Sequence, residues 1–304
     1  MASLTVIDRA LDEFFGVSAA GPDPGFSRFI PATYDPIHFD WRNTFEPGFT
    51  TLFNGLMLRG AEDVSTVFCS VFPAAEVLDE FLEAARPGDL FFTHHPLFIE
   101  TGDPRGEPGR GFLPIAPDRI EAMRDKALSF YSCHAPLDVH PEVGTTAAMV
   151  DALGGRRMDG FWPYGAGYAG VICAVEPLAR HELITRLREI FDLPYVDVDG
   201  GHPAAIRRLA VVAGAGYKVE PMREAEAGGA QAYVTGEIHD RIADDYGRGL
   251  LAQTKVFAAE TAMALIGVSH AASEHLVMET QMPEWLTARF KIEVVPLAPS
   301  TWWR

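Results

Sequence analysis

The chain has 304 residues, enough for one large domain or two of ordinary size. Hydrophobic residues make up 48% of the sequence and charged residues 22%, a balance typical of globular proteins. Acidic residues outnumber basic residues by 42 to 25, giving a formal net charge of −17. This charge disfavours a broad contact with nucleic acid or with an anionic membrane surface.

The three cysteines, Cys69, Cys133 and Cys173, are far apart and form no CxxC pair. We therefore expect no disulfide framework and a reducing compartment such as the cytoplasm. The opening residues lack the basic start of a signal peptide, and no apolar run reaches the length of a transmembrane helix. The sequence thus predicts a soluble cytoplasmic protein.

Along the first half, residues 1–15 predict an amphipathic helix. Residues 20–50 are rich in glycine, proline and aromatic residues, and we interpret them as a long irregular segment packed down by its aromatics. A regular alternation then begins at Thr66. Strands are expected at 67–72, 90–93 and 129–134, helices at 74–85 and 118–128, and a loop at 100–117.

The second half repeats this plan. Strands are expected at 168–175, 194–199, 209–214, 231–235 and 264–269, and helical stretches at 179–190, 219–228, 250–263 and from about His270. Alternating strands and helices indicate an α/β protein with mostly parallel sheets covered by helices.

The two halves also echo each other in detail. Adding 142 to the numbers of the first half aligns its strands with those of the second without a gap, pairing Val67 with Leu209, Leu90 with Ala232 and Thr93 with Thr235. The dipeptide His94-His95 then falls on Gly236-Glu237. A six-residue difference in the loops next aligns His134-x-x-x-Asp138 with His270-x-x-x-Glu274.

The carboxyl ends of parallel strands meet in one crevice, where α/β proteins bind ligands. If the two halves face each other, the echo predicts that six side chains converge: His94, His95, His134, Asp138, His270 and Glu274. Imidazoles and carboxylates without thiolates suit zinc, iron, manganese, nickel or cobalt. Five or six such ligands exceed what one catalytic metal needs, so two ions sharing a bridging carboxylate are the economical interpretation.

Each candidate also has a simpler interpretation. Histidines at a strand end can merely satisfy backbone carbonyls, Asp138 could cap the helix that follows, and His270 with Glu274 could be a surface i,i+4 pair. We prefer metal ligands for these groups because the pattern repeats at matching strand ends. For His134 a supporting position beside the metals, or a proton donor, is kept open.

Three other features have structural interpretations. Gly214 and Gly216 in VVAGAGY are expected to form a tight turn after a strand, because a lone Gly-x-Gly is a weak dinucleotide signal. Cys133 is interpreted as a buried, inert thiol. The large apolar pair Trp302-Trp303 is expected to pack against the core or a neighbouring subunit.

An ordered set of short motifs resembles the Nif3-like family (NGG1-interacting factor 3), the dinuclear-metal hexameric proteins often labelled as GTP cyclohydrolase type 2 homologues. The motifs are NGLMLRG (54–60), THHPLF (93–98), CHAPLDVHPEVG (133–144), TGEIHD (235–240) and SHAASE (269–274). Two departures from the family pattern, Met57 in place of glutamine and Thr145-Thr146 after Gly144, concern the substrate more than the metals.

The resemblance implies two interlinked α/β domains with a metal cleft between them, a homohexamer and two divalent metal ions. The domains would be 1–140, completed by part of 255–304, and 141–254. The family's ligands carry over to His94 and His95 of the paired-histidine motif, Asp138 of H-x-x-L-D, and His270 and Glu274 of H-x-x-[TS]-E. His134 matches the first histidine of H-x-x-L-D.

Two functions remain open at this point. The first is a metal-dependent hydrolase in which activated water attacks a nucleotide or a related small molecule, as the family label suggests. The second is a non-catalytic role in metal handling, or as a metal-stabilised oligomeric scaffold that binds another protein.

Overall fold

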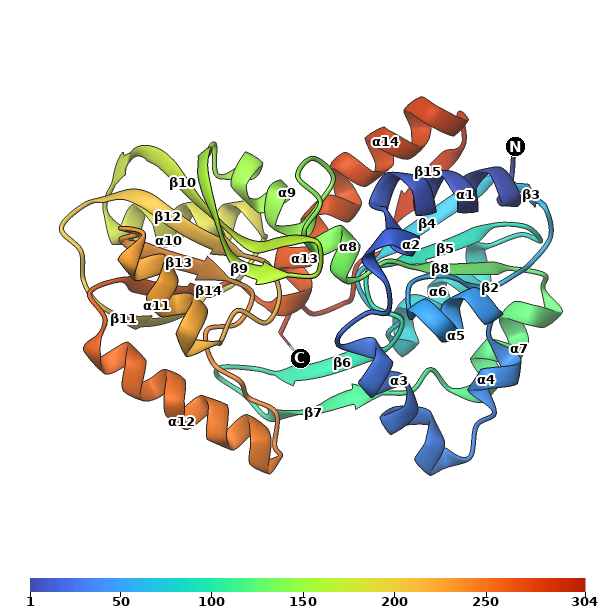
Figure 1. Cartoon of the computed structure of the whole chain (residues 1–304), viewed down its shortest axis with the longest axis horizontal. Coiled ribbons are helices and arrows are strands. Elements are labelled where there is room, and N and C mark those ends of the chain that lie inside the picture. The colour runs from blue at the N-terminus through green and yellow to red at the C-terminus, as the bar shows by residue number, and fades with distance from the viewer. Residues whose placement is uncertain (304) are drawn as a thin grey trace. The chain divides into compact units, whose positions relative to one another are not determined.

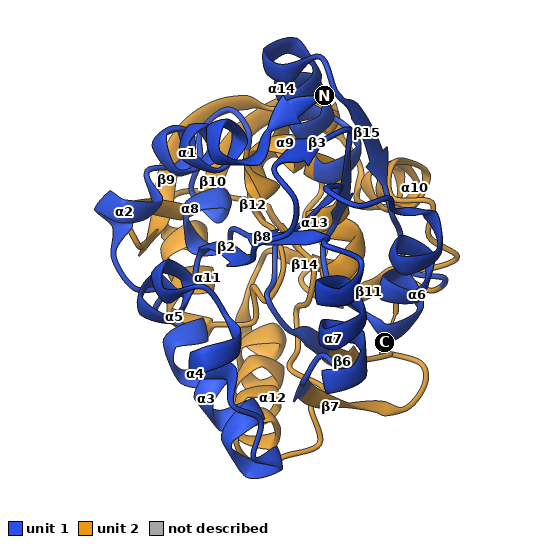
Figure 2. Ribbon diagram, turned by 90° about the vertical axis from the view of Figure 1, so that its right-hand side faces the viewer, with its two compact units in different colours: residues 1–99, 112–143, 278–300 blue, residues 100–111, 144–277, 301–304 orange. Residues whose placement is uncertain are grey.

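The computed structural model describes residues 1–303, and its contacts divide the chain into two compact units (Figure 2). Unit 1 comprises 1–99, 112–143 and 278–300, and unit 2 comprises 100–111, 144–277 and 301–304. Whether independently folding domains have the boundaries expected from the sequence, after residues 140 and 254, stays a prediction.

The sheet of unit 1 has the strand order β15-β4-β5-β8-β2, and its first four strands are parallel (Figure 1). Their bounds are β2 Gly55–Leu58, β4 Thr66–Ser70, β5 Leu90–Thr93, β8 Ser129–Ser132 and β15 Glu293–Pro296. A small antiparallel pair, β1 Ala2–Ser3 and β3 Asp63–Val64, accompanies them.

The helices of unit 1 form where the sequence has amphipathic stretches and capping groups. In α1, Leu4–Phe15, the side chain of Ser3 accepts the N–H of Val6, and Gly16 ends the helix in the left-handed conformation. The other predicted helices are also present, as α6 Ala75–Ala84 and α7 Pro117–Asp125. Two further helices of this unit are α8 Ala135–Asp138 and α14 Gln281–Phe290.

The segment 20–50 is mostly helical, so its interpretation as irregular was wrong. It contains α3 Phe26–Tyr34, a 3-10 turn at Asp35–Ile37, α4 Trp41–Thr44 and α5 Pro47–Leu52, after a short α2 Val17–Ala20. Pro36 and Pro47 sit at helix starts, where a missing N–H costs little, and Pro31 lies inside α3. These short helices are not recognisable by periodicity. Its aromatics do pack inward, as expected: Phe26, Tyr34 and Phe49 are almost fully buried.

The segment 100–117 is also more ordered than expected. It contributes most of a two-stranded ribbon, β6 Phe98–Gly102 and β7 Pro108–Leu113. Gly109 in this ribbon exchanges backbone hydrogen bonds with residues 241 and 243. A Cβ at Gly109 would collide with the backbone of residues 100 and 101 in the neighbouring strand of the ribbon. Glycine is therefore required where β6 and β7 approach each other closely.

The sheet of unit 2 is mixed, with the order β11-β14-β13-β12-β10-β9. The three central strands are parallel, whereas β11, β10 and β9 run antiparallel to their neighbours. The bounds are β9 Arg156–Tyr164, β10 Gly167–Leu178, β11 Asp197–Gly200, β12 Ile206–Val212, β13 Ala232–Thr235 and β14 Ala264–Gly267. The strand β9 was not predicted because its sequence is polar and mostly exposed, as in an edge strand.

Helices cover both faces of this second sheet. Alternate residues of β12 show the division: Leu209 and Val211 belong to one buried cluster, and Ala210 and Val212 to another. The first cluster includes residues of α9 Thr145–Ala152, α10 Arg180–Ile190 and α13 His270–Glu279, and the second includes residues of α11 Val219–Ala227 and α12 Asp245–Glu260. The predicted α/β class is therefore confirmed.

The strand registers confirm the echo between the halves. In unit 1, Val67 pairs with Leu90 and Ser70 with Thr93. Adding 142 to each number gives the pairs observed in unit 2, Leu209 with Ala232 and Val212 with Thr235. The third strand of each set differs by one residue, because His134 follows β8 by two positions and His270 follows β14 by three.

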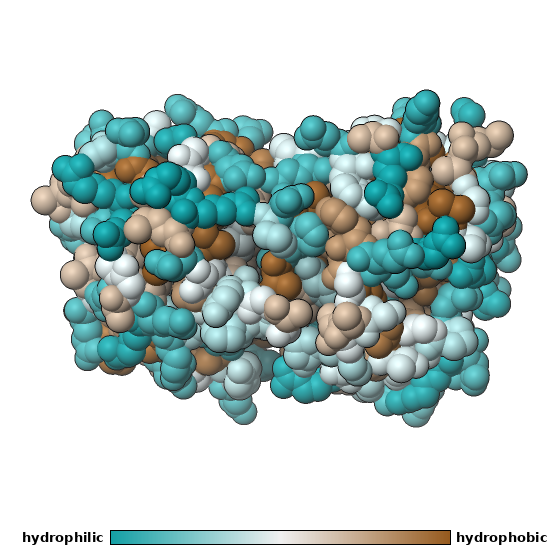
Figure 3. Space-filling view, turned by 45° about the horizontal axis from the view of Figure 1, so that its top comes forward, coloured by the Kyte–Doolittle hydropathy of each residue, from teal (hydrophilic) through white to brown (hydrophobic). Residues whose placement is uncertain are grey.

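Among residues 1–303, no helix is long and apolar enough to cross a membrane. Hydrophilic side chains cover most of the face drawn in Figure 3, with small hydrophobic patches between them.

Candidate metal centre

The histidines of FFTHHPLF lie directly after β5, where the chain leaves the sheet. The N–H of His94 donates to the carbonyl of Ser70, and the N–H of His95 to that of Val71. The Thr93 hydroxyl donates to the carbonyl of His95 at 2.7 Å, which fixes the turn at the strand end. Both imidazoles are buried, with exposed fractions of 0% and 3%.

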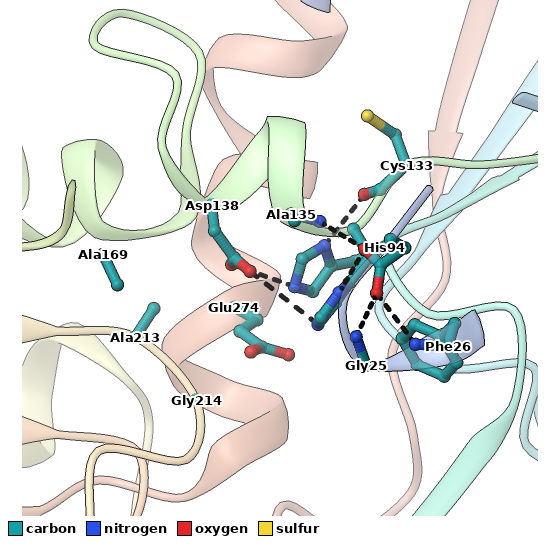
Figure 4. A network of polar contacts seen from close by, with 12 residues as sticks. Gly25, Phe26, His94, Cys133, Ala135, Asp138, Ala169, Ala213, Gly214 and Glu274 are labelled. Carbon is teal, nitrogen blue, oxygen red and sulfur yellow. Dashed lines mark hydrogen bonds and ion pairs between the residues drawn. The ribbon is translucent and has the colours of Figure 1, made fainter. Parts of the chain in front are cut away.

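The ring of His94 is held from both of its nitrogens. Its Nδ1 is 2.9 Å from the backbone carbonyl oxygen of Cys133, which makes this nitrogen the N–H donor. Its Nε2 then faces Oδ1 of Asp138 at 3.2 Å, and Figure 4 shows the two partners on opposite sides of the ring. When one ring nitrogen of a histidine donates a hydrogen bond to a carbonyl, the other nitrogen carries a lone pair that can bind a metal.

His134 is oriented by a buried carboxylate that sequence reasoning missed. Its Nδ1 lies 2.9 Å from Oδ2 of Asp23, and its Nε2 lies 3.7 Å from Oδ2 of Asp138. Its backbone N–H donates to the side-chain oxygen of Asn54 at 2.7 Å. Asp23 itself also accepts the N–H groups of Gly25 and Phe26 and so begins α3.

The pKa of Asp23 reflects these contacts. Burial alone would raise the pKa of this carboxyl, but the charge and the hydrogen bond of His134, with backbone N–H groups, hold it well below its usual range. Asp23 is therefore a carboxylate, and the pair with His134 is an aspartate–histidine dyad in the interior of unit 1.

These side chains form one cluster, which we call the unit 1 set: His94, His95, His134 and Asp138. The ring centroids of the three histidines lie 4.5 to 4.9 Å apart. One nitrogen from each ring can be chosen so that all three lie within 4.8 Å of one another. That spacing fits nitrogen ligands around a common cation, since two ligands on one zinc are separated by about 3 to 4 Å at ordinary bond lengths.

A second cluster, the unit 2 set, consists of Glu237, His270 and Glu274. His270 opens α13 and places its ring between the two carboxylates, with Nδ1 at 2.9 Å from Glu237 and Nε2 at 3.1 Å from Glu274. All three residues are buried, with exposed fractions of 6% or less. The interpretation of His270 and Glu274 as a surface pair is therefore wrong.

The electrostatics of the unit 2 set favour positive charge. Burial alone would lower the pKa of His270, but Glu274 and Glu237 raise it to about 10. The field of two buried carboxylates that retains a proton on this imidazole also favours a bound cation.

Glycines leave room for these side chains. Gly214 has a φ of +67°, and a Cβ there would overlap Oε1 of Glu274. Gly216 is placed so that a Cβ would overlap the hydroxyl of Thr235. The N–H of Gly216 donates to the carbonyl of Gly214 at 3.0 Å, so the expected tight turn after β12 is present.

The structure thus brings together the predicted residues of each half: the four of unit 1 in one cluster, and His270 with Glu274 in the other. Sequence reasoning missed Asp23, Asn54 and Glu237. The echo contained a signal for Glu237, which aligns with His95. Asp23 and Asn54 lie in segments without a counterpart in that echo; Asn54 opens the motif NGLMLRG but was given no role there, and nothing in the sequence marked Asp23.

Other predicted features have structural roles. Asp138 is the last residue of α8, and the helix that follows, α9, begins after Gly144, so Asp138 does not cap that helix. Cys133 is fully buried, and burial raises the pKa of its thiol well above the usual value, as expected of an inert cysteine. His239 is buried between Asp199 at 2.9 Å and the hydroxyl of Thr254 at 2.8 Å, a local hydrogen-bonding role.

The chain is similar to known proteins in sequence. The family model described as Duf34/NIF3 (NGG1p interacting factor 3) matches residues 52–300. A protein of Pseudomonas aeruginosa named "GTP cyclohydrolase 1 type 2 homolog" is 27% identical over 244 residues, which cover 79% of this chain and 86% of that protein.

Solved structures have the same fold. The structure of protein ybgI, whose title gives its function as unknown, has a TM-score of 0.67 at 19% identity and covers 99% of both chains. The crystal structure of TTHA1606 from Thermus thermophilus has a TM-score of 0.64 at 20% identity and covers 98% of this chain and 99% of that one.

Proposed function

Because this chain belongs to the Duf34/NIF3 family, we propose that it is a divalent-metal-dependent hydrolase of small molecules. The observation that carries the proposal is the pair of buried clusters, in which imidazoles and carboxylates face one another without lysine or arginine among them. Such groups are seldom buried together unless they are paired or coordinate a metal.

We assign the metal ligands as predicted from the sequence: His94, His95, Asp138, His270 and Glu274. The donor set supports a borderline or hard divalent ion, with zinc, iron, manganese, nickel and cobalt as candidates. Five ligands would suit two ions, and Asp138, whose two oxygens each face a histidine at 3.2 and 3.7 Å, would be available to both of them. This assignment requires the unit 1 and unit 2 sets to share the ions, as the echo predicts.

Bound divalent ions would supply Lewis acidity and lower the pKa of a coordinated water. The side chains of the protein would hold the reacting groups in position and transfer protons to or from them. His134 is our candidate proton donor, because its Nδ1 is held by Asp23 and its Nε2 is directed toward Asp138. Asp23 keeps that imidazole ring in one orientation.

A purine nucleotide is the first candidate substrate, because several curated relatives carry the name "GTP cyclohydrolase 1 type 2 homolog". By the same family relationship we propose a homohexamer. The three cysteines are free and buried, which suits a reducing compartment such as the cytoplasm.

The test starts with elemental analysis of the purified protein, for which we expect two transition-metal ions per chain. The loaded protein is then incubated with a panel of nucleotides, phosphoesters and cyclic amides, and turnover is followed by chromatography. Loss of turnover in His95→Ala, with the oligomer unchanged by light scattering, supports a hydrolase. Bound metal without turnover across the panel overturns the enzymatic proposal and favours a metal-stabilised scaffold.

A further inference from the structure

A single residue, Trp302, contacts both ends of the helical turn that carries His270 and Glu274. The hydroxyl of Ser269, immediately before His270, donates a hydrogen bond to the backbone carbonyl of Trp302. The indole of Trp302 lies against the ring of His275, immediately after Glu274, with centroids 5.2 Å apart. Trp302 also packs on the cluster that includes Ala272 of the same turn.

The contact with Ser269 matters because this residue holds a strained backbone. Its φ of +76° lies in the left-handed region, which a residue with a side chain seldom adopts. Its hydroxyl oxygen accepts the N–H of Ala272 at 3.4 Å. Since the single hydroxyl proton goes to Trp302, the lone pairs are directed toward the first turn of α13.

The contact with His275 fixes the other end of the turn. His275 is 2% exposed and follows Glu274 directly, so its contact with Trp302 restrains the residue next to the one that carries the carboxylate. The distance between His270 Nε2 and Glu274 Oε1 is 3.1 Å, and a metal site tolerates displacements of only a few tenths of an ångström.

We propose that Trp302 is a positioning residue for the His270–Glu274 pair, holding the turn from both ends in the geometry that binds metal. The inference rests on the metal role proposed above for these two residues. Substitutions of residues that orient metal ligands typically weaken metal binding by about 10- to 100-fold.

The neighbouring tryptophan provides a matched control. Trp303 stacks on Tyr195, with parallel rings 5.7 Å apart, and its indole N–H donates to the carbonyl of Tyr195 at 3.3 Å. Trp303→Ala therefore removes an aromatic ring of the same kind from the same segment while leaving the contacts of Trp302 in place. Trp302→Phe is the conservative variant, because phenylalanine keeps an aromatic face against His275.

The first measurement uses metal-free protein, so it does not depend on the proposed function. Hydrogen–deuterium exchange of the amides of residues 270–275 should be at least about tenfold faster in Trp302→Ala than in the wild type, because loss of the indole removes the contact that restrains His275 while the backbone contact with Ser269 remains. Trp303→Ala and Trp302→Phe should exchange like the wild type. Equal exchange in the two alanine variants overturns the inference.

The second measurement titrates each protein with Co²⁺ alone and follows its visible absorption. We expect Trp302→Ala to bind Co²⁺ about tenfold or more weakly with an altered spectrum, whereas Trp303→Ala and Trp302→Phe bind like the wild type. A Trp302→Ala variant with the affinity and spectrum of the wild type contradicts the inference alone. A wild-type protein that binds no Co²⁺ contradicts the proposed function, and the exchange experiment still decides the bracing role.

Discussion

At the scale of single residues, the two sets depend on groups that are not themselves candidate ligands. Gly214 leaves space for the Glu274 carboxylate, because a Cβ at this position would overlap it. Asp23 contributes a buried carboxylate that pairs with the imidazole of His134. Both residues lie outside the motifs that identify the family, so their roles are visible only in the folded chain.

Gly214→Ala should impair the unit 2 set. The new methyl group displaces Glu274, and a left-handed alanine costs about 1–2 kcal/mol, so both metal affinity and the free energy of unfolding should fall. Isothermal titration with Zn²⁺ and urea denaturation measure the two effects. Gly249→Ala is the control, because its Cβ meets nothing within 4 Å in α12 and should stabilise by about 0.5–1 kcal/mol. Unchanged metal affinity in Gly214→Ala would contradict the role assigned to this glycine.

Asp23→Asn should lower the free energy of unfolding by about 3 kcal/mol, because it leaves the largely buried imidazole of His134 without its charged partner. Urea denaturation of the metal-free protein measures the loss. The comparison is Asp35→Asn, which breaks an ion pair with Arg42 whose side chains are 49% and 58% exposed, and it should lower the free energy of unfolding much less, because water screens an exposed pair. Equal losses in the two variants would mean that the dyad contributes no special stability.

At the scale of elements, polar side-chain contacts connect β11, the edge strand of the second sheet, to its neighbours. Asp199 on β11 binds Lys255 of α12 at 2.7 Å and His239, after β13, at 2.9 Å. His239 lies two residues beyond Glu237, so these contacts support the loop that presents the Glu237 carboxylate to His270. The loop is thereby tied to an edge strand and to a helix from elsewhere in unit 2.

This network predicts a pH dependence of stability. Burial alone would raise the pKa of Asp199, but hydrogen bonds from Lys255, Gly200 and His239 lower it from the usual 3.8 to about 2. A lowered pKa in the folded state means that the stabilisation is present above about pH 4 and is lost as the pH falls toward 2. Because Asp199 is partly exposed, we expect a contribution of about 1 kcal/mol.

Urea denaturation from pH 6 to pH 2 checks this expectation. The difference in stability between the wild type and Asp199→Asn should be constant above about pH 4 and shrink below it, since protonation removes the same charge from the wild type. A difference that stays constant down to pH 2 would show that the charge of Asp199 is not what stabilises the contact.

At the scale of the whole molecule, the chain builds two α/β units on one plan and places a cluster of ligand-type residues in each. The matching registers of β4 with β5 and β12 with β13 show that the plan is shared at the level of individual residue pairs. The sequence predicts that the two clusters share metal ions, and this has a measurable consequence for stability.

Removal of metal with a chelator should lower the thermal midpoint, and saturation with metal at about 100 times its dissociation constant should stabilise by about 2.7 kcal/mol per site. If the clusters share ions, His95→Ala in unit 1 and Glu274→Gln in unit 2 should each remove most of this stabilisation. If each cluster binds its own ion, each variant should remove only the stabilisation that comes from the ion bound to its own cluster. Calorimetry of loaded and metal-free protein separates these outcomes and tests the predicted convergence.

Much of the fold could be predicted because its signals are local. The buried strands around Phe91 and Val234 and the amphipathic helix at 75–84 follow from hydrophobic periodicity alone. Periodicity failed for 20–50 and 100–117, where the helices are too short to show a period and the ribbon is stabilised by pairing with distant residues.

The sequence by itself determined the α/β class, the echo between the halves, the family and the candidate ligands, because strand ends and motif spacing are encoded by neighbouring residues. Only the tertiary structure decided which other groups support them. Asp23 and His134 are 111 positions apart, and Ser269 and Trp302 are 33 apart. No local pattern specifies such contacts, since they depend on how whole elements pack.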